Sequence, residues 1–165
     1  TIDSKKIDAE LKKDNTANGR AGAAAARGAL NTQESKQEIW HRLVHTNEWS
    51  NAEVMAAAYA FNRTTTPAML DPFVDLYFND AKYVFENKPY KIAEYILFGL
   101  FPFALANKDL ANNTKRWLER NQKAEHTLRR LVKENLGILE RALAAQAVDK
   151  AATFPSDATE KEFED

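Results

Sequence analysis

The sequence predicts an all-α protein made of consecutive amphipathic helices. Apolar residues recur at three-and-four spacing over much of the stretch from about 33 to 149, the periodicity of one helix face. Only five glycines and five prolines interrupt the 165 residues. No segment alternates apolar and polar residues over five positions, as a half-buried strand would. Two architectures fit: antiparallel helix pairs stacked as an α-solenoid, or a closed helical bundle.

Composition narrows the class of protein. Hydrophobic residues make up 44% of the chain, enough for one domain with a core. The 23 basic and 24 acidic residues nearly cancel, so charge gives no reason to expect nucleic acid as a partner. Cysteine is absent, which excludes disulfides, thiolate zinc sites and a cysteine nucleophile. No apolar run reaches the roughly 18 residues of a membrane span, and we expect a cytoplasmic protein without a membrane partner.

The first two predicted helices differ in composition. Residues 4–14 carry Ile7 and Leu11 four positions apart, on one helix face. Residues 16–29 are rich in alanine and glycine, with four consecutive alanines at 23–26. Alanine favours helix but supplies little apolar volume. We therefore expect the second helix to pack closely against a neighbour.

Two helix starts in the middle of the chain have strong signals. Thr32 is a favoured N-cap residue for a helix that ends near position 45. Ser50 and Glu53 have the spacing of a capping box, and Trp49 and Val54 match the hydrophobic staple that often accompanies it. The predicted buried residues of these two helices are Ile39, Trp40, Leu43, Val44, Val54, Ala58 and Phe61.

The later helices are predicted to begin at Asp71–Pro72, at Pro89 and at Asp109, and the last to run from about 124 to 148. Together with Thr32 and Ser50, these starts lie about 20 residues apart. Helix pairs then recur about every 40 residues, in the range of HEAT-type repeats. The predicted apolar stripe of the last helix comprises Leu128, Leu131, Val132, Asn135, Leu136, Leu139, Ala142 and Leu143.

Domain organisation follows from a change in composition. Residues 4–148 form the predicted helical-repeat domain. Residues 149–165 carry six acidic residues against Lys150 and Lys161, together with Pro155. We expect this second segment to be a disordered acidic tail.

Histidines provide the one metal-like pattern. His41 and His45 are four residues apart, the spacing of zinc proteases with an H-E-x-x-H motif. Arg42 stands where that motif has its glutamate, and His126 is remote in sequence. We interpret these histidines as surface or capping residues. The segment is therefore predicted to hold no catalytic, cofactor-binding or metal-ligating residue, and its substrate-facing residues cannot be assigned from helix phase.

Three further segments have two interpretations each. The apolar stretch at 98–103 is interpreted as a buried connection, with contact to another domain as the alternative. The basic side of the last helix (Arg129, Arg130, Lys133 and Arg141) lies near glutamates at 125, 134 and 140. This favours a salt-bridged solvated face over a ligand site. The alanine run is a close helix contact or a flexible lead-in, and we favour the contact.

Five stretches in this order carry a family resemblance. They are DNTANGRAGAAAARGA, TQESKQEIWHRLVHTNEWSNAEV, LDPFVDLYF, IAEYILFGLFP and LRRLVKENLGILERALAAQ, within about 7–149. The chain resembles the carboxy-terminal helical domain of aminopeptidase N-type zinc aminopeptidases, in their bacterial and actinobacterial branch. Trp49, where that family more often has an aliphatic residue, and the acidic tail depart from the pattern.

The resemblance implies the later part of a HEAT-like domain of a larger chain. In that family the domain closes over the catalytic domain, encloses the active-site chamber and limits access of peptides. The resemblance also implies a zinc ion in the catalytic domain of the larger chain. The family's zinc-binding motif H-E-x-x-H and its substrate-binding motif G-[AG]-M-E-N do not occur in this segment, so the zinc site is expected outside it. The implied partners are that catalytic domain and the peptide substrate.

The alternative is a free-standing helical-repeat module that binds a peptide or a protein. An excised domain should have an exposed apolar side on its first helix layer, whereas a free-standing module should have polar caps at both ends.

Overall fold

The computed structural model describes residues 3–152, which contain eight α-helices and no strand. The helices are α1 (Ser4–Lys13), α2 (Ala17–Gly28), α3 (Gln33–His45), α4 (Asn51–Ala60), α5 (Pro72–Asn87), α6 (Tyr90–Gly99), α7 (Lys108–Arg120) and α8 (His126–Ala152). Two short 3₁₀ helices, η1 (Pro67–Leu70) and η2 (Phe103–Leu105), lie in the connections before α5 and α7. The all-α prediction is confirmed.

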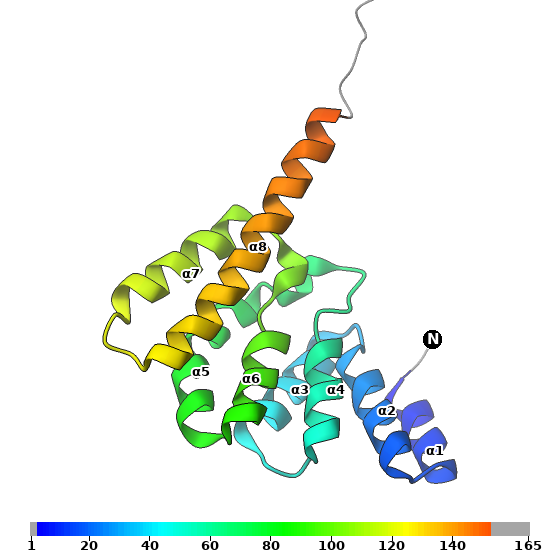
Figure 1. The fold of residues 1–165 in the computed structure, drawn as a ribbon. Helices are drawn as coiled ribbons and strands as arrows, with labels where there is room; N and C mark the ends of the chain where they lie inside the picture. Colours follow the sequence, from blue (N-terminus) through cyan, green and yellow to red (C-terminus); the bar gives the residue numbers. More distant parts are fainter. Residues whose placement is uncertain (1–2, 153–165) are drawn as a thin grey trace, which may run out of the picture.

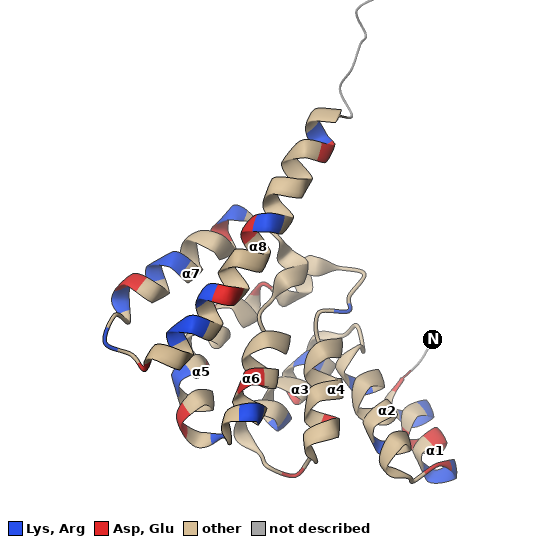
Figure 2. Ribbon diagram, in the orientation of Figure 1, with Lys and Arg blue, Asp and Glu red and all other residues tan. Residues whose placement is uncertain are grey.

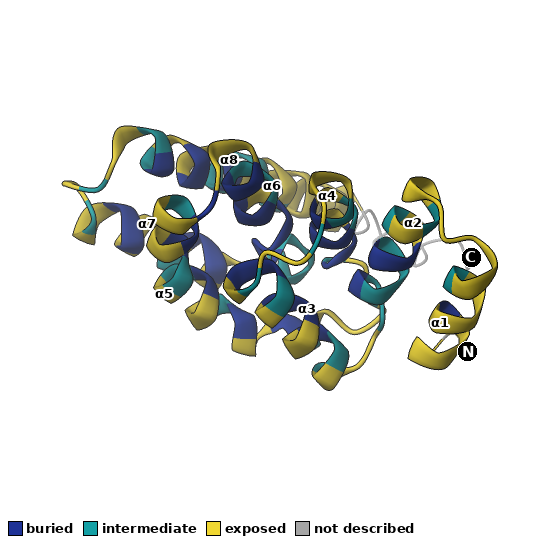
Figure 3. Ribbon diagram, turned by 90° about the horizontal axis from the view of Figure 1, so that it is seen from below, coloured by how far each residue is buried: buried dark blue, intermediate teal, exposed yellow. Residues whose placement is uncertain are grey.

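The helices form two layers (Figure 3). Consecutive helices pack as the pairs α1–α2, α3–α4, α5–α6 and α7–α8. The even-numbered helices form one layer, in which α2 packs on α4, α4 on α6, and α6 on α8. The odd-numbered helices lie in the other layer, and α1–α2 stands at the end far from α7 (Figure 1). This stacking of pairs is the arrangement of the predicted solenoid.

Small residues bring the even-numbered helices close together. A Cβ atom on Gly28 of α2 would lie 2.5 Å from the carbonyl oxygen of Ala57 in α4. A Cβ atom on Gly99 of α6 would lie 2.4 Å from the carbonyl carbon of Ala58. Ala24 of α2 is buried in the hydrophobic core. The close contact predicted for the alanine-rich helix is therefore confirmed.

Aromatic side chains form the centre of the core between the layers. Trp40 of α3 packs on Phe61 and Phe73, with ring centroids 5.9 and 5.4 Å apart. Tyr77 packs edge-on against Phe101 at 5.2 Å. All the predicted core residues of α3 and α4 are buried, since Ile39, Trp40, Leu43, Val44, Val54, Ala58 and Phe61 each expose 7% or less.

A buried lysine ties the first two helix pairs together. The side chain of Lys36 in α3 is fully buried, and its ammonium group donates to three backbone carbonyl oxygens. These belong to Gly28 at the end of α2 (2.7 Å), and to Phe61 (2.6 Å) and Arg63 (3.3 Å) after α4. The last carbonyls of a helix lack partners within it and carry the negative end of its dipole, so a cation is favoured there.

Similar side-chain caps recur along the stack. Lys88, at the end of α5, donates to the carbonyl oxygen of Thr46 at the end of α3. Asn62 donates to the carbonyls of Gly99, the last residue of α6, and of Phe101, both at 2.9 Å. Arg129 of α8 donates to the carbonyls of Leu118 (2.6 Å) and Asn121 (2.8 Å) at the end of α7.

The side-chain caps predicted at Thr32 and Ser50 are confirmed, whereas those predicted at Asp71 and Asp109 are wrong. The Thr32 side chain accepts from the Ser35 amide, and the capping box of Ser50 and Glu53 is present. Asp71 is not a side-chain cap, because η1 runs directly into α5 and holds Asp71 in a helical conformation. Asp109 is not the cap of α7 either. Asn107 accepts from the Leu110 amide, which places Asp109 in the first turn.

The last helix is longer at its carboxy end than predicted. It ends at Ala152, so residues 149–152 of the predicted acidic tail belong to α8, whose end projects from the body of the molecule (Figure 1). Residues 153–165 lie outside the described part of the chain. Five residues of the predicted apolar stripe of α8 are buried. Leu136 and Leu143 are half-buried and Ala142 is exposed, since the carboxy-terminal part of α8 extends beyond the other helices.

The apolar connection at 98–103 is mostly buried, in agreement with its interpretation as a buried connection between helices. Leu100, Phe101 and Pro102 are buried, while Phe98 exposes 40% of its surface. Within residues 3–152, no helix is both long enough and apolar enough to cross a membrane.

Candidate functional site

The histidine pair does not form a metal site. His41 and His45 are both exposed on α3, with ring centroids 5.6 Å apart. Asp80 of α5 lies beside His45, with Nε2 and Oδ2 3.9 Å apart, and the same Oδ2 accepts from Trp40 Nε1 at 2.8 Å. His126 begins the distant α8. Among residues 3–152, no three His, Asp or Glu side chains gather where they could hold a metal ion. The residues present therefore do not fit a zinc ion.

An exposed aromatic cluster lies on the even-numbered layer instead. Tyr59 of α4 exposes 47% of its surface, and Phe98 of α6 exposes 40%. Their rings meet edge-on at 5.4 Å, and Tyr59 meets Tyr95 of α6 in the same way at 5.9 Å. Large apolar groups held at a surface by each other are typical of contact sites. Tyr59, Tyr95 and Phe98 are called the aromatic face below.

A groove of about 250 Å³ opens beside the aromatic face. Leu131 and Ile138 of α8 contribute apolar atoms, and Lys91, Glu94 and Glu134 contribute charge. Lys91 bonds Glu94 at 2.7 Å and lies over the Tyr95 ring, 5.1 Å from its centroid. The groove therefore joins an apolar wall to a paired polar edge, which suits a peptide side chain more than a free ion. Its lining residues are Tyr59, Lys91, Glu94, Phe98, Leu131, Glu134, Asn135 and Ile138.

Ionisation at the groove follows from these contacts. Partial burial, with Tyr95 and Glu94 nearby, raises the pKa of Tyr59 above its usual value. The hydrogen bond from Lys91 to Glu94 raises the pKa of Lys91. Tyr59 is therefore a neutral phenol and Lys91 a cation at neutral pH. Neither shift prepares a general base or a nucleophile.

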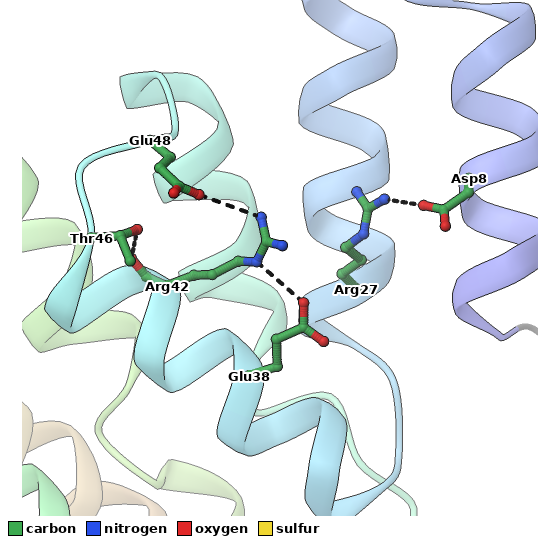
Figure 4. Close-up of polar contacts among 6 residues, drawn as sticks. All are labelled: Asp8, Arg27, Glu38, Arg42, Thr46 and Glu48. Carbon is green, nitrogen blue, oxygen red and sulfur yellow. Dashed lines mark hydrogen bonds and ion pairs between the residues drawn. The ribbon is translucent and has the colours of Figure 1, made fainter.

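Ion pairs lie at the surface of the first three helices (Figure 4). Arg27 of α2 forms an ion pair with Asp8 of α1. Arg42 of α3 bonds Glu38 at 3.2 Å and lies 3.9 Å from Glu48 in the following loop. All five side chains are at least 22% exposed. Ion pairs of this kind stabilise by only about 0–1 kcal/mol, so this cluster is a surface feature.

A second, more apolar groove lies between α1 and α2. Its volume is about 560 Å³, and Ile7, Leu11, Ala23 and Ala26 supply much of its wall. Residues 4–29 are weakly apolar in composition, which by itself predicts a polar cap at this end of the stack. The structure instead leaves an apolar groove in the first helix pair.

The sequence pattern alone does not reveal the aromatic face. Tyr59 stands between Ala58 and Ala60, which are both buried, so the sequence does not indicate that the Tyr59 side chain is exposed. Phe98 lies in a segment interpreted as internal. The usable signal was that α4 is apolar around its whole circumference, which leaves some apolar residue outside once one face is buried.

This chain is similar in sequence to known proteins over most of its length. A family model described as the ERAP1-like C-terminal domain matches residues 1–141. Aminopeptidase N of Streptomyces lividans is 36% identical over 146 residues, which is 88% of this chain. The aligned part is 17% of that relative, so the chain spans about one sixth of its length. The chain belongs to the family of ERAP1-like C-terminal domains, the carboxy-terminal domain of aminopeptidase N-like proteins.

Proposed function

We propose that this segment is the non-catalytic carboxy-terminal domain of a zinc aminopeptidase. The parent chain would remove amino-terminal residues from peptides, with zinc bound in its catalytic domain, where it would polarise the scissile carbonyl and activate water. The similarity to an aminopeptidase N over 88% of the chain supports the parent activity. We include a cytoplasmic location in the proposal, to be tested by cell fractionation.

The domain would enclose the active-site chamber and limit the access of peptides. The aromatic face is the observation that carries this role. It places apolar side chains at an exposed surface of the even-numbered layer, where an extended peptide can lay its own side chains. We assign this layer to the chamber side.

The apolar groove between α1 and α2 supports a position inside a longer helical stack. An exposed apolar side on the first helix layer is what a domain cut from a longer solenoid should have. The proposal assigns the open part of this groove, where Leu11 and Ala26 are partly exposed, to helices that precede this segment in the parent chain. The same observation weighs against the free-standing binding module.

Kinetics of the parent enzyme test the chamber role. Tyr59→Ala combined with Phe98→Ala should raise KM several-fold for peptides of about ten residues. The kcat/KM for an amino-acid anilide, which is too short to reach the aromatic face, should stay the same. Tyr83→Ala is the matched control, because Tyr83 is 44% exposed on α5 in the other layer. Equal loss on both substrates, or no change on the long peptide, would refute the assignment.

The absence of catalysis has its own test. The purified 165-residue chain should cleave no peptide, with or without added zinc. Zinc-dependent cleavage by this chain would overturn the proposal.

A further inference from the structure

One polar atom at the groove beside the aromatic face has no partner. Asn135 of α8 is only 2% exposed, yet it lines that groove. Its amide nitrogen donates to the carbonyl oxygen of Leu97 at 2.9 Å and to the hydroxyl of Tyr77 at 3.1 Å. Its amide oxygen, Oδ1, accepts no hydrogen bond within residues 3–152.

The orientation of this amide is fixed by the groups that it contacts. A carbonyl oxygen can only accept, so the Leu97 carbonyl selects the nitrogen side of the Asn135 amide. The Tyr77 hydroxyl donates its hydrogen to the same carbonyl at 2.9 Å, so it too accepts from the Asn135 nitrogen. Leu97 lies in the last turn of α6, where carbonyls lack helical partners, which explains why two side chains converge on it. Oδ1 is therefore held on the opposite side of the amide.

The free oxygen faces the groove. Within residues 3–152, no side-chain nitrogen or oxygen is both enclosed and without a hydrogen-bond partner. Because Oδ1 has no partner, it reaches accessible space, and the groove of about 250 Å³ is the hollow that Asn135 lines. A covered acceptor without a partner is unfavourable, so a ligand that fills the groove should donate a hydrogen bond to Oδ1.

The walls of the groove suit an aromatic ring. Tyr59 and Phe98 meet edge-on at 5.4 Å on one side, and Leu131 and Ile138 of α8 add aliphatic surface. A ring between such walls buries its faces and can pack edge-to-face on its aromatic neighbours. The ligand group should therefore combine a ring with a hydrogen-bond donor.

The charges at the rim favour a neutral donor. Glu94 is paired with Lys91 at 2.7 Å, and Glu134 with Arg130 at 2.8 Å. Figure 2 shows basic residues next to acidic ones on both α6 and α8. A cation would lose its hydration in exchange for an amide oxygen and carboxylates that already have partners. An ionised carboxylate has no donor for Oδ1.

We propose that the groove binds the tyrosine side chain of a peptide and that Asn135 determines this specificity. The ring would pack between the aromatic face and α8, and the phenol hydroxyl would donate to Oδ1. Phenylalanine fits the same walls but leaves Oδ1 covered and without a partner. The use of this contact on a peptide substrate rests on the proposed function, whereas the recognition of tyrosine does not.

Titration with small amides tests recognition without any peptidase activity. The ¹⁵N-labelled 165-residue chain is titrated with the N-acetyl amides of tyrosine, O-methyltyrosine and phenylalanine, and amide chemical shifts give each Kd. We expect shifts around Leu131 and Ile138, and a Kd for tyrosine about three- to tenfold lower than for the two amides without a donor, as one neutral hydrogen bond contributes. Ile138→Trp, which fills the groove, should abolish these shifts, and Tyr83→Ala on α5 should leave them unchanged. Equal Kd values, shifts elsewhere, or tighter binding of the lysine or tryptophan amide would overturn the proposal.

A substitution at Asn135 separates recognition from structural support. Asn135→Leu removes Oδ1 together with the bonds to Leu97 and Tyr77, so circular dichroism checks the fold. The tyrosine amide should then bind no better than the phenylalanine amide, whose own Kd should stay the same. Equal weakening of both amides would mean that Asn135 only supports the groove, and would overturn its role in specificity. If Asn135→Leu does not fold, the three amides on the unchanged chain decide.

Peptide kinetics then connect the groove to the proposed function. In the parent enzyme, peptides of about ten residues carry one tyrosine or one phenylalanine at successive positions. At one position tyrosine should raise kcat/KM about three- to tenfold over phenylalanine, and Asn135→Leu should remove that difference. Tyrosine recognition by the chain without such a position would refute the chamber role and leave the recognition intact. Absence of a tyrosine preference in both experiments would overturn the recognition itself.

Discussion

Lys36→Met should lower the unfolding free energy substantially, although it changes the size of the side chain little. Methionine keeps the length and apolar stem of the side chain but donates no hydrogen bond. The carbonyls of Gly28, Phe61 and Arg63 would then lose the Lys36 ammonium group, their shared donor. Because these carbonyls end α2 and follow α4, the loss should loosen the joint between the first two helix pairs.

The magnitude is a balance of two terms. A hydrogen bond to a charged group contributes about 1.5–3 kcal/mol, so the three bonds of Lys36 contribute on the order of 6 kcal/mol. Against this, burial lowers the pKa of Lys36 from 10.5 to about 8. At about 1.36 kcal/mol per unit, holding the charged form costs on the order of 3 kcal/mol, which methionine avoids. The expected loss of unfolding free energy is about 3 kcal/mol.

Urea unfolding followed by circular dichroism measures this loss. With a slope of about 1–3 kcal/mol per molar urea, the midpoint should fall by about 1–3 M while the slope stays unchanged. Lys133→Met is the control, because Lys133 is exposed on α8 and should change stability by less than about 0.5 kcal/mol. If the two variants have the same midpoint, the capping role of Lys36 is refuted.

Three further predictions concern stability. The folded-state pKa of Lys36, about 8, is below its unfolded value of 10.5, so the unfolded chain binds more protons between these values. The unfolding free energy of the wild type should therefore rise relative to Lys36→Met from pH 8 to pH 10.5, and a constant difference in urea titrations would contradict this. Gly99→Ala should lower the unfolding free energy by about 1–3 kcal/mol, since the new methyl would lie 2.4–2.6 Å from atoms of Ala58. The control Gly22→Ala, whose methyl would have nothing within 4 Å, should raise the unfolding free energy by about 0.5–1 kcal/mol. Equal melting temperatures of the two variants would refute the close packing at Gly99. Ser50→Ala should lower stability by about 1 kcal/mol by removing the capping box, and an unchanged thermal midpoint would argue against it.

Periodicity and caps predicted the parts of the fold that depend on neighbours in sequence. The helix class, the Ser50–Glu53 box and the buried stripe of α3 each rest on residues within one or two turns of each other. The error at Asp109 has the same origin. Both Asn107 and Asp109 are favoured caps, and the turn before α7, with Ala106 in a left-handed conformation (φ 37°), decides which one is used.

Contacts between helix pairs could not be predicted in the same way. Lys36 lies on a helix rich in polar residues and looks like a solvated lysine, yet its partners are 8 to 27 residues away. Asn62 and Arg129 likewise cap helices other than their own. The aromatic face was missed because its residues come from α4 and α6, and helix phase does not say which apolar residues stay outside.

The size of the native chain tests the central claim most directly. An antibody against this segment, used on a denaturing gel of the source cells, gives the mass of the chain that carries it. We predict a single band several times larger than 18.7 kDa, as expected for a domain that aligns with 17% of an aminopeptidase N. A band at 18.7 kDa would contradict the assignment and leave a free-standing helical protein whose partner would have to be found.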